Sequence, residues 1–250
     1  MNEMIKEVSE KGFSDSMYDL IGVFGIILAI LISIWYGKKL GLKFHQILLT
    51  DVVILMASFF AIFVIILDFL FFLEERTSFP VIIMTSIVRT LLIMPAVGYL
   101  MSRILKIKWT TICDFLIVIP LVIGGVGCFG CIFTGCCRGY SSEWGIYNVR
   151  VEETVFPVQI LNAFIMFSIL VYLVIRAKRN NYVSDGLSYP IMLVLLCSTR
   201  FITEFFCDNA KLFFGLSMIS LHCIKDIIVA IIAYLKVKRK QKMNATCLIN

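Results

Sequence analysis

Long apolar runs alternate with short polar segments along almost the whole chain. Each run approaches or exceeds the ~20 residues that an α-helix needs to cross the hydrocarbon core of a membrane. The pattern predicts an all-α, polytopic membrane protein with seven transmembrane helices, in which residues 1–250 form a single domain. The predicted spans cover residues 17–36, 47–72, 80–102, 112–135, 156–175, 186–206 and 212–235.

Lysine and arginine residues gather in alternate loops between these runs. Three lie in each of the segments 37–46, 103–111 and 176–185, and five follow residue 235, whereas the other loops hold one or two each. Cation-rich loops remain in the cytoplasm, so we expect the N-terminus outside and the C-terminus in the cytoplasm. Seven spans also place the two termini on opposite sides, so the charge pattern and the span count agree.

The composition excludes several other classes of protein. Hydrophobic residues make up 60% of the chain and charged residues 16%, and the mean hydropathy is +0.95. A soluble domain is closer to half apolar. The net charge of +6 does not indicate nucleic-acid binding, because the positive residues lie in short loops. Residues 1–16 mix acidic and basic side chains and do not resemble a cleavable signal peptide.

Residues 124–139, with the sequence GGVGCFGCIFTGCCRG, are rich in glycine and cysteine at the outer end of the fourth predicted span. Irregular backbone inside a membrane is tolerated where it faces protein or a water-filled cavity. We therefore predict that this segment forms the wall of a site. The alternative is a close helix crossing packed through glycine. The loop 136–155 follows directly and is expected to be extracytoplasmic and next to the site.

Ionisable side chains inside the predicted spans suggest what this site binds. Arg89 lies about 13 Å and Arg200 about 9 Å from the outer ends of their spans, at 1.5 Å per residue. Glu204 lies on the same helix face as Arg200, four residues later. Because a guanidinium binds phosphate through two aligned hydrogen bonds, this layer suits an anionic phospholipid head group. The alternative is a structural Arg–Glu pair. Asp51 and Asp114 are interpreted as helix-start residues on the cytoplasmic side.

Several short motifs carry a resemblance to a known family. The glycine-rich segment is similar to a signature G-R-x-G-N-x-x-x-x-E-x-x-G, and its glycines coincide with Gly127, Gly130 and Gly139. The motifs W-G, H-P-x-Q and R-F-x-x-E-F resemble Trp144-Gly145, Phe156-Pro157-Val158-Gln159 and Arg200-Phe201-Ile202-Thr203-Glu204-Phe205. On these motifs most of the chain resembles the prolipoprotein diacylglyceryl transferases.

The resemblance implies a transferase that moves a diacylglyceryl group from phosphatidylglycerol to the lipobox cysteine of a prolipoprotein. The reaction would occur at the outer face of the bacterial cytoplasmic membrane. The implied partners are phosphatidylglycerol, preprolipoprotein signal peptides and other membrane lipids, with no nucleic acid, no cofactor and no metal. The implied catalytic residues are Arg200 and Glu204. The implied substrate-binding residues are Tyr18, Arg89, Gly127, Cys128, Gly130, Cys131, Arg138, Gly139 and Gln159.

The chain departs from the family pattern at polar positions. Cys128, Cys131 and Cys136 replace the signature arginine, asparagine and glutamate. Val88 and Phe156 stand where the family has histidines in its third span and in H-P-x-Q. The fold and the lipid site are therefore expected to be retained, with altered chemistry.

Other interpretations follow from these departures. We hypothesise that Arg89, Arg138 and Arg200 supply the positive charge that binds the phosphate. A catalytically silent relative that binds lipid or a lipoprotein precursor is one alternative. A membrane thiol oxidoreductase is another, because four cysteines cluster within residues 128–137. These cysteines could be packed thiols, disulfide-bonded, metal-binding or redox-active.

Overall fold

The computed structural model describes residues 3–5, 14–71, 94–135, 139–207 and 216–247. Within these ranges the chain is mostly helical. The long helices are α2 (Ser14–Lys39), α3 (Phe44–Phe71), α6 (Val118–Thr134), α7 (Val158–Arg179), α8 (Ser188–Glu204) and α9 (Met218–Cys247). A further helix covers residues 94–105, and the short helix α5 (Trp109–Phe115) precedes α6.

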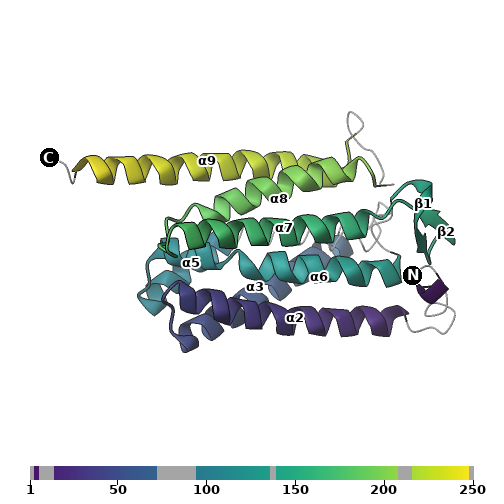
Figure 1. Cartoon of the computed structure of the whole chain (residues 1–250), viewed down its shortest axis with the longest axis horizontal. Coiled ribbons are helices and arrows are strands. Elements are labelled where there is room, and N and C mark those ends of the chain that lie inside the picture. Colours follow the sequence, from purple (N-terminus) through teal and green to yellow (C-terminus); the bar gives the residue numbers. More distant parts are fainter. Residues whose placement is uncertain (1–2, 6–13, 72–93, 136–138, 208–215, 248–250) are drawn as a thin grey trace.

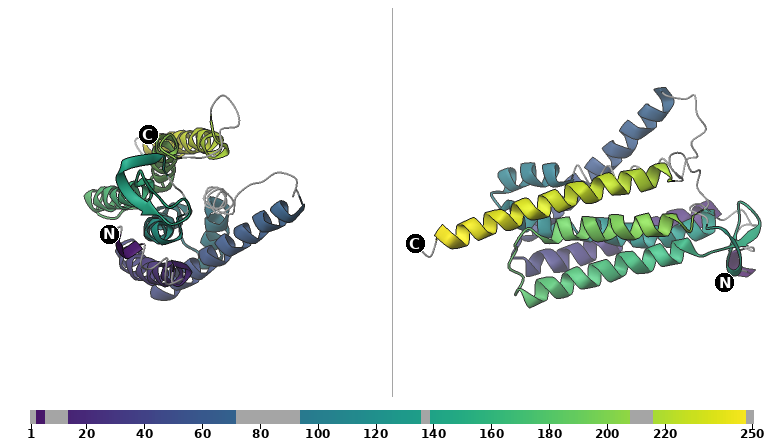
Figure 2. Two further views of the ribbon diagram at one scale, coloured as in Figure 1. Left: turned by 90° about the vertical axis from the view of Figure 1, so that its right-hand side faces the viewer. Right: turned by 90° about the horizontal axis from the view of Figure 1, so that it is seen from above.

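Helices α2, α6, α7, α8 and α9 form a bundle with roughly parallel axes (Figure 1). From one side of the bundle to the other the order is α9, α8, α7, α6 and α2, and each neighbouring pair is in contact. Helix α3 packs against α2 and leans away from the other helices, as Figure 2 shows. The core lies around α5 and α6, where all residues from 112 to 119 are buried.

Among the residues that the structure describes, three helical segments are long and apolar enough to cross a membrane: Ser16–Lys39, Trp109–Thr134 and Val158–Arg179. They coincide with the predicted spans 17–36, 112–135 and 156–175. Helices α3, α8 and α9 cover most of three other predicted spans. Most of the predicted span 80–102 lies outside the described residues, so the count of seven stays a prediction.

The span formed by α5 and α6 is interrupted by a turn at Leu116 and Ile117. Pro120 lies in the first turn of α6. Proline has no N–H, so it cannot donate the helical hydrogen bond that the carbonyl of Leu116 would otherwise accept. The sequence thus explains why one apolar run forms two helices.

A β-hairpin corrects the expectation of an all-α chain. The strands β1 (Ser141–Asn148) and β2 (Glu153–Val155) pair antiparallel, with Ile146 opposite Val155 and Asn148 opposite Glu153. The hairpin lies at one end of the bundle, within the predicted loop 136–155 (Figure 1). A short antiparallel pair inside one loop gives a weak sequence signal compared with a long apolar run, so hydropathy alone missed it.

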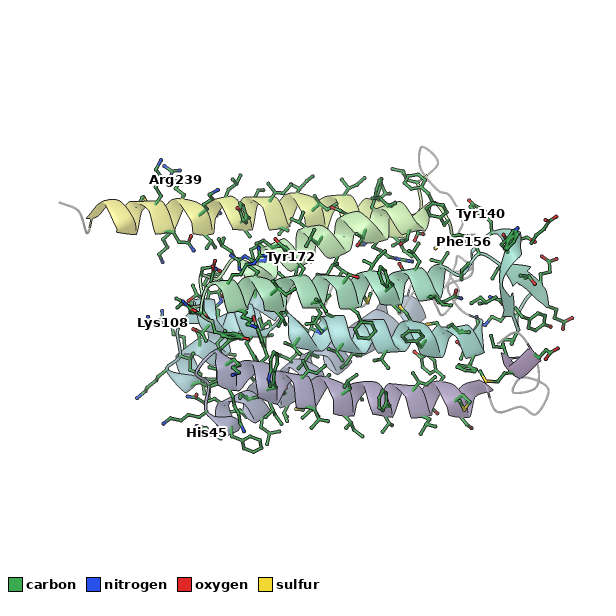
Figure 3. The ribbon with its side chains drawn as sticks, viewed as in Figure 1. His45, Lys108, Tyr140, Phe156, Tyr172 and Arg239 are labelled. Carbon is green, nitrogen blue, oxygen red and sulfur yellow. The ribbon has the colours of Figure 1, made fainter. Side chains whose placement is uncertain are left out.

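The two ends of the bundle differ in charge. His45, Lys108 and Arg239 lie at one end, and Tyr140 and Phe156 lie at the other (Figure 3). The cation-rich segments after α2, before α5, after α7 and at the end of α9 all gather at the first end. This arrangement agrees with the predicted placement of these segments on one side of the membrane.

Two aspartates have different roles from those predicted. Asp114 lies within α5, and its carboxylate accepts hydrogen bonds from the backbone N–H groups of Gly186 and Ser188, each 3.0 Å long. The Asp114 carboxylate therefore accepts from backbone N–H groups at the start of α8, and not from those at the start of its own helix. Asp51 is buried within α3 and accepts a hydrogen bond from the Ser33 hydroxyl of α2. Both aspartates connect helices to one another.

Candidate functional site

A buried ion pair lies in the last turns of α8. The Arg200 Nη2 atom is 3.0 Å from the Glu204 Oε2 atom, and the two side chains are 11% and 3% exposed. The four-residue spacing places both groups on one helix face, as predicted. A guanidinium has several N–H donors, so it can bind a carboxylate and a phosphate at the same time.

The residue that precedes helix α9 supplies a second partner to the glutamate. The Ser217 hydroxyl donates a 2.8 Å hydrogen bond to the Glu204 Oε1 atom. The Ser217 oxygen in turn accepts a 3.2 Å hydrogen bond from the backbone N–H of Ser220, and it lies 3.2 Å from the Ser220 hydroxyl. Ser217 lies within the last predicted span, 212–235, but only the structure identifies its contact with Glu204.

The chain after α8 joins the hairpin and the start of α7. Cys207 forms an isolated antiparallel bridge with Gly139, and the N–H of Tyr140 donates to the carbonyl of Phe206 over 3.2 Å. The rings of Phe156 and Phe206 stack with centroids 5.2 Å apart. The position of the Arg200–Glu204 pair is therefore tied to the hairpin.

Gly139 is required by this close approach. A Cβ atom at this position would lie 2.5 Å from the carbonyl oxygen of Phe156 and 3.0 Å from its Cβ atom. Backbone atoms cannot move aside as the end of a flexible side chain can. The glycine expected to bind substrate thus has a structural role in joining the hairpin to α7.

Cys207 is a buried thiol beside the ion pair. Its side chain is 1% exposed and donates a 3.5 Å hydrogen bond to the carbonyl of Thr203. Burial raises the pKa of the Cys207 thiol, and the nearby Arg200 charge offsets only part of this shift. Burial therefore disfavours the thiolate form of Cys207, which is the form that acts as a nucleophile.

The glycine-rich end of α6 is capped by the hairpin. Gly135 ends the helix with a φ of +65°, a conformation that glycine adopts readily. The Asn148 amide donates to the carbonyl of Gly135 over 3.0 Å, and the Arg150 Nε donates to the carbonyl of Thr134 over 2.8 Å. Arg150 also places a positive charge at the negative end of the helix dipole.

Along α6 the glycines differ in how closely they are packed, so the close-packing interpretation applies to some of them and the site wall stays a prediction. A Cβ atom on Gly130 would lie 2.8 Å from the ring of Tyr18, and one on Gly125 would lie 3.0 Å from the ring of Phe167. These glycines allow close helix packing. Gly127 has no heavy atom within 4 Å of its Cβ position, so this part of α6 faces open space.

The structure brings some of the predicted site residues together. It places Tyr18 against Gly130 and Arg200 against Glu204. Gly139 instead pairs with Cys207, which is not among the predicted site residues. Gln159 is buried at the start of α7, and Cys128 and Cys131 lie on α6, buried and partly buried. Arg89 and Arg138 lie outside the described residues, so their role in phosphate binding stays a prediction.

The cysteines give no sign of a metal site in the part of the chain that the structure describes. No three His, Cys, Asp or Glu side chains within it are placed to hold one metal ion. Cys136 and Cys137 lie outside that part, so the state of the four-cysteine cluster stays a prediction.

Comparison with models of protein families covers most of the chain. A family model described as prolipoprotein diacylglyceryl transferase matches residues 8–236, which is most of the chain. No curated protein sequence matches the chain.

Proposed function

Because the chain belongs to the prolipoprotein diacylglyceryl transferase family, we propose that it transfers a diacylglyceryl group from phosphatidylglycerol to a lipobox cysteine of prolipoproteins. The acceptor is the thiol of a prolipoprotein signal peptide, and the reaction takes place at the outer face of the cytoplasmic membrane. The buried Arg200–Glu204 pair at the hairpin end of the bundle is the observation that carries the proposal.

The chemistry requires a positive charge at the lipid phosphate. The acceptor sulfur attacks the glycerol carbon that bears the phosphate ester, an S–C bond forms, and the C–O bond to the phosphate breaks. Glycerol phosphate leaves with the bonding electrons of the C–O bond, and the thiol proton passes to this leaving phosphate. A buried cation stabilises the charge that develops on this leaving group more strongly than a cation in water. Arg200 has this role, and Glu204 orients it.

Mass spectrometry of a lipobox peptide tests this proposal directly. Purified protein in phosphatidylglycerol micelles is expected to add one diacylglyceryl group to the peptide thiol. Arg200→Ala should lower the rate by roughly 10²–10³-fold, the usual cost of losing a group that stabilises transition-state charge. Arg103→Ala is the matched control, because Arg103 is exposed and contacts Tyr99 on its own helix.

A silent lipid-binding relative is the second candidate. The replacement of polar family positions by Cys128, Cys131 and Val88 favours it. In that case the wild-type protein forms no product, yet phosphatidylglycerol raises its melting temperature and Arg200→Ala removes this protection. Product from wild-type protein that persists at an unchanged rate in Arg200→Ala contradicts the assigned role of the arginine.

A further inference from the structure

The Glu204 carboxylate is held from two helices at once. Its Oε2 atom contacts Arg200 on α8 at 3.0 Å, and its Oε1 atom accepts the 2.8 Å hydrogen bond from Ser217 at the start of α9. At 3% exposure this carboxylate has lost its hydration, so its orientation depends on its protein partners. Removing one partner changes how the carboxylate contacts the other.

Ser217 is itself fixed in place. It is 6% exposed, and its oxygen accepts the backbone N–H of Ser220 over 3.2 Å. A hydroxyl that accepts from the backbone keeps its proton for another acceptor. The start of α9 therefore presents a single oriented donor to α8.

We propose that Ser217 is a positioning residue, which holds the Glu204 carboxylate so that the Arg200 guanidinium remains directed at the lipid phosphate. This inference rests on the proposed function. Glu204 and a phosphate are both anionic acceptors for the same planar guanidinium. A carboxylate that loses its second partner turns both oxygens toward the arginine and forms a bidentate pair. That bidentate pair uses two guanidinium N–H groups that would otherwise bind the phosphate.

The test separates lipid binding from the chemical step. Ser217→Ala is expected to raise the KM for phosphatidylglycerol by roughly tenfold, the scale of one hydrogen bond to a charged group, with a smaller change in kcat. Ser217→Thr keeps the hydroxyl and is expected to restore the KM. Ser102→Ala is the matched control, because Ser102 is also 6% exposed but donates only to Tyr99 of its own helix.

A double-mutant cycle shows whether Ser217 acts through the glutamate. In a Glu204→Ala background, Ser217→Ala should change the KM little further, because the carboxylate that it positions is gone. Equal and independent effects in the two backgrounds would overturn the inference, as would a fall in kcat with an unchanged KM. A loss of thermal stability alone, equal in the Ala and Thr variants, would also overturn it.

The proposed function and this inference fail in different ways. If wild-type protein forms no product but phosphatidylglycerol raises its melting temperature, the proposal of transferase activity is wrong. The same variants then test Ser217 through the lipid concentration that gives half-maximal protection. Wild-type protein with neither product nor protection overturns both.

Discussion

A single glycine decides how closely the two strands of the hairpin pair. A Cβ atom at Gly145 would lie 1.9 Å from the carbonyl oxygen of Val155 and 2.7 Å from its carbon. Since both are backbone atoms of β2, the paired strands leave no room for any side chain at this position. Cysteines replace polar family positions nearby, but the glycines that shape the backbone are retained.

Gly145→Ala is therefore expected to separate the two strands. The steric conflict and the lost strand pairing should lower thermal stability by several degrees and reduce transferase activity, because the hairpin is tied to the end of α8. A thermal melt in detergent measures the first effect and the peptide assay the second. Gly22→Ala is the control, since no heavy atom lies within 4 Å of its Cβ position. Equal melting temperatures for Gly145→Ala and Gly22→Ala would contradict the close strand pairing at Gly145.

At the scale of elements, α8 is fixed at both ends. Asp114 of α5 accepts two backbone N–H groups at the start of α8, and Arg176 of α7 donates to Asp185 and Ser188 beside them. At the other end Cys207 pairs with Gly139. Helix α8 carries Arg200 between these two attachments, so the position of the cation depends on contacts far from the site.

Asp114→Ala is expected to destabilise the protein. It leaves two buried N–H donors at the start of α8 without their acceptor, at a cost on the order of 1–3 kcal/mol. The melting temperature of Asp114→Ala should fall. That of Asp114→Asn should fall less, because asparagine keeps one acceptor oxygen. Glu152→Ala is a suitable control because this acidic side chain is exposed in the hairpin turn. Equal melting temperatures for Asp114→Ala and the control would show that the contact contributes nothing.

The whole molecule has a cationic end and a hairpin end. The positive-inside rule then predicts that the hairpin lies outside the cytoplasm. In intact cells a membrane-impermeant maleimide should label Trp144→Cys, whose native side chain is 85% exposed at the hairpin. His45→Cys, at the opposite end (Figure 3), should be labelled only after permeabilisation. Both variants are best made in a background where other accessible cysteines are serine. The reverse labelling pattern would invert the proposed orientation.

Hydropathy and charge predicted most of this architecture, because long apolar runs and loop cations are features of single segments. The Arg200–Glu204 contact was equally predictable, since i,i+4 geometry follows from one helix. The contacts of Glu204 with Ser217, of Asp114 with Gly186, and of Gly139 with Cys207 join residues far apart in sequence. Periodicity contains no information about such pairs.

The hydrogen bond between Ser217 and Glu204 also has a consequence for the biosynthesis of the protein. Chains emerge from the ribosome N-terminus first, so α8, with Arg200 and Glu204, leaves the ribosome before α9 does. Until then the buried carboxylate lacks the hydroxyl that holds its second oxygen. Emergence of α9 therefore brings the Ser217 hydroxyl to Glu204, and a chain that ends before residue 217 would contain the Arg200–Glu204 pair without this hydrogen bond.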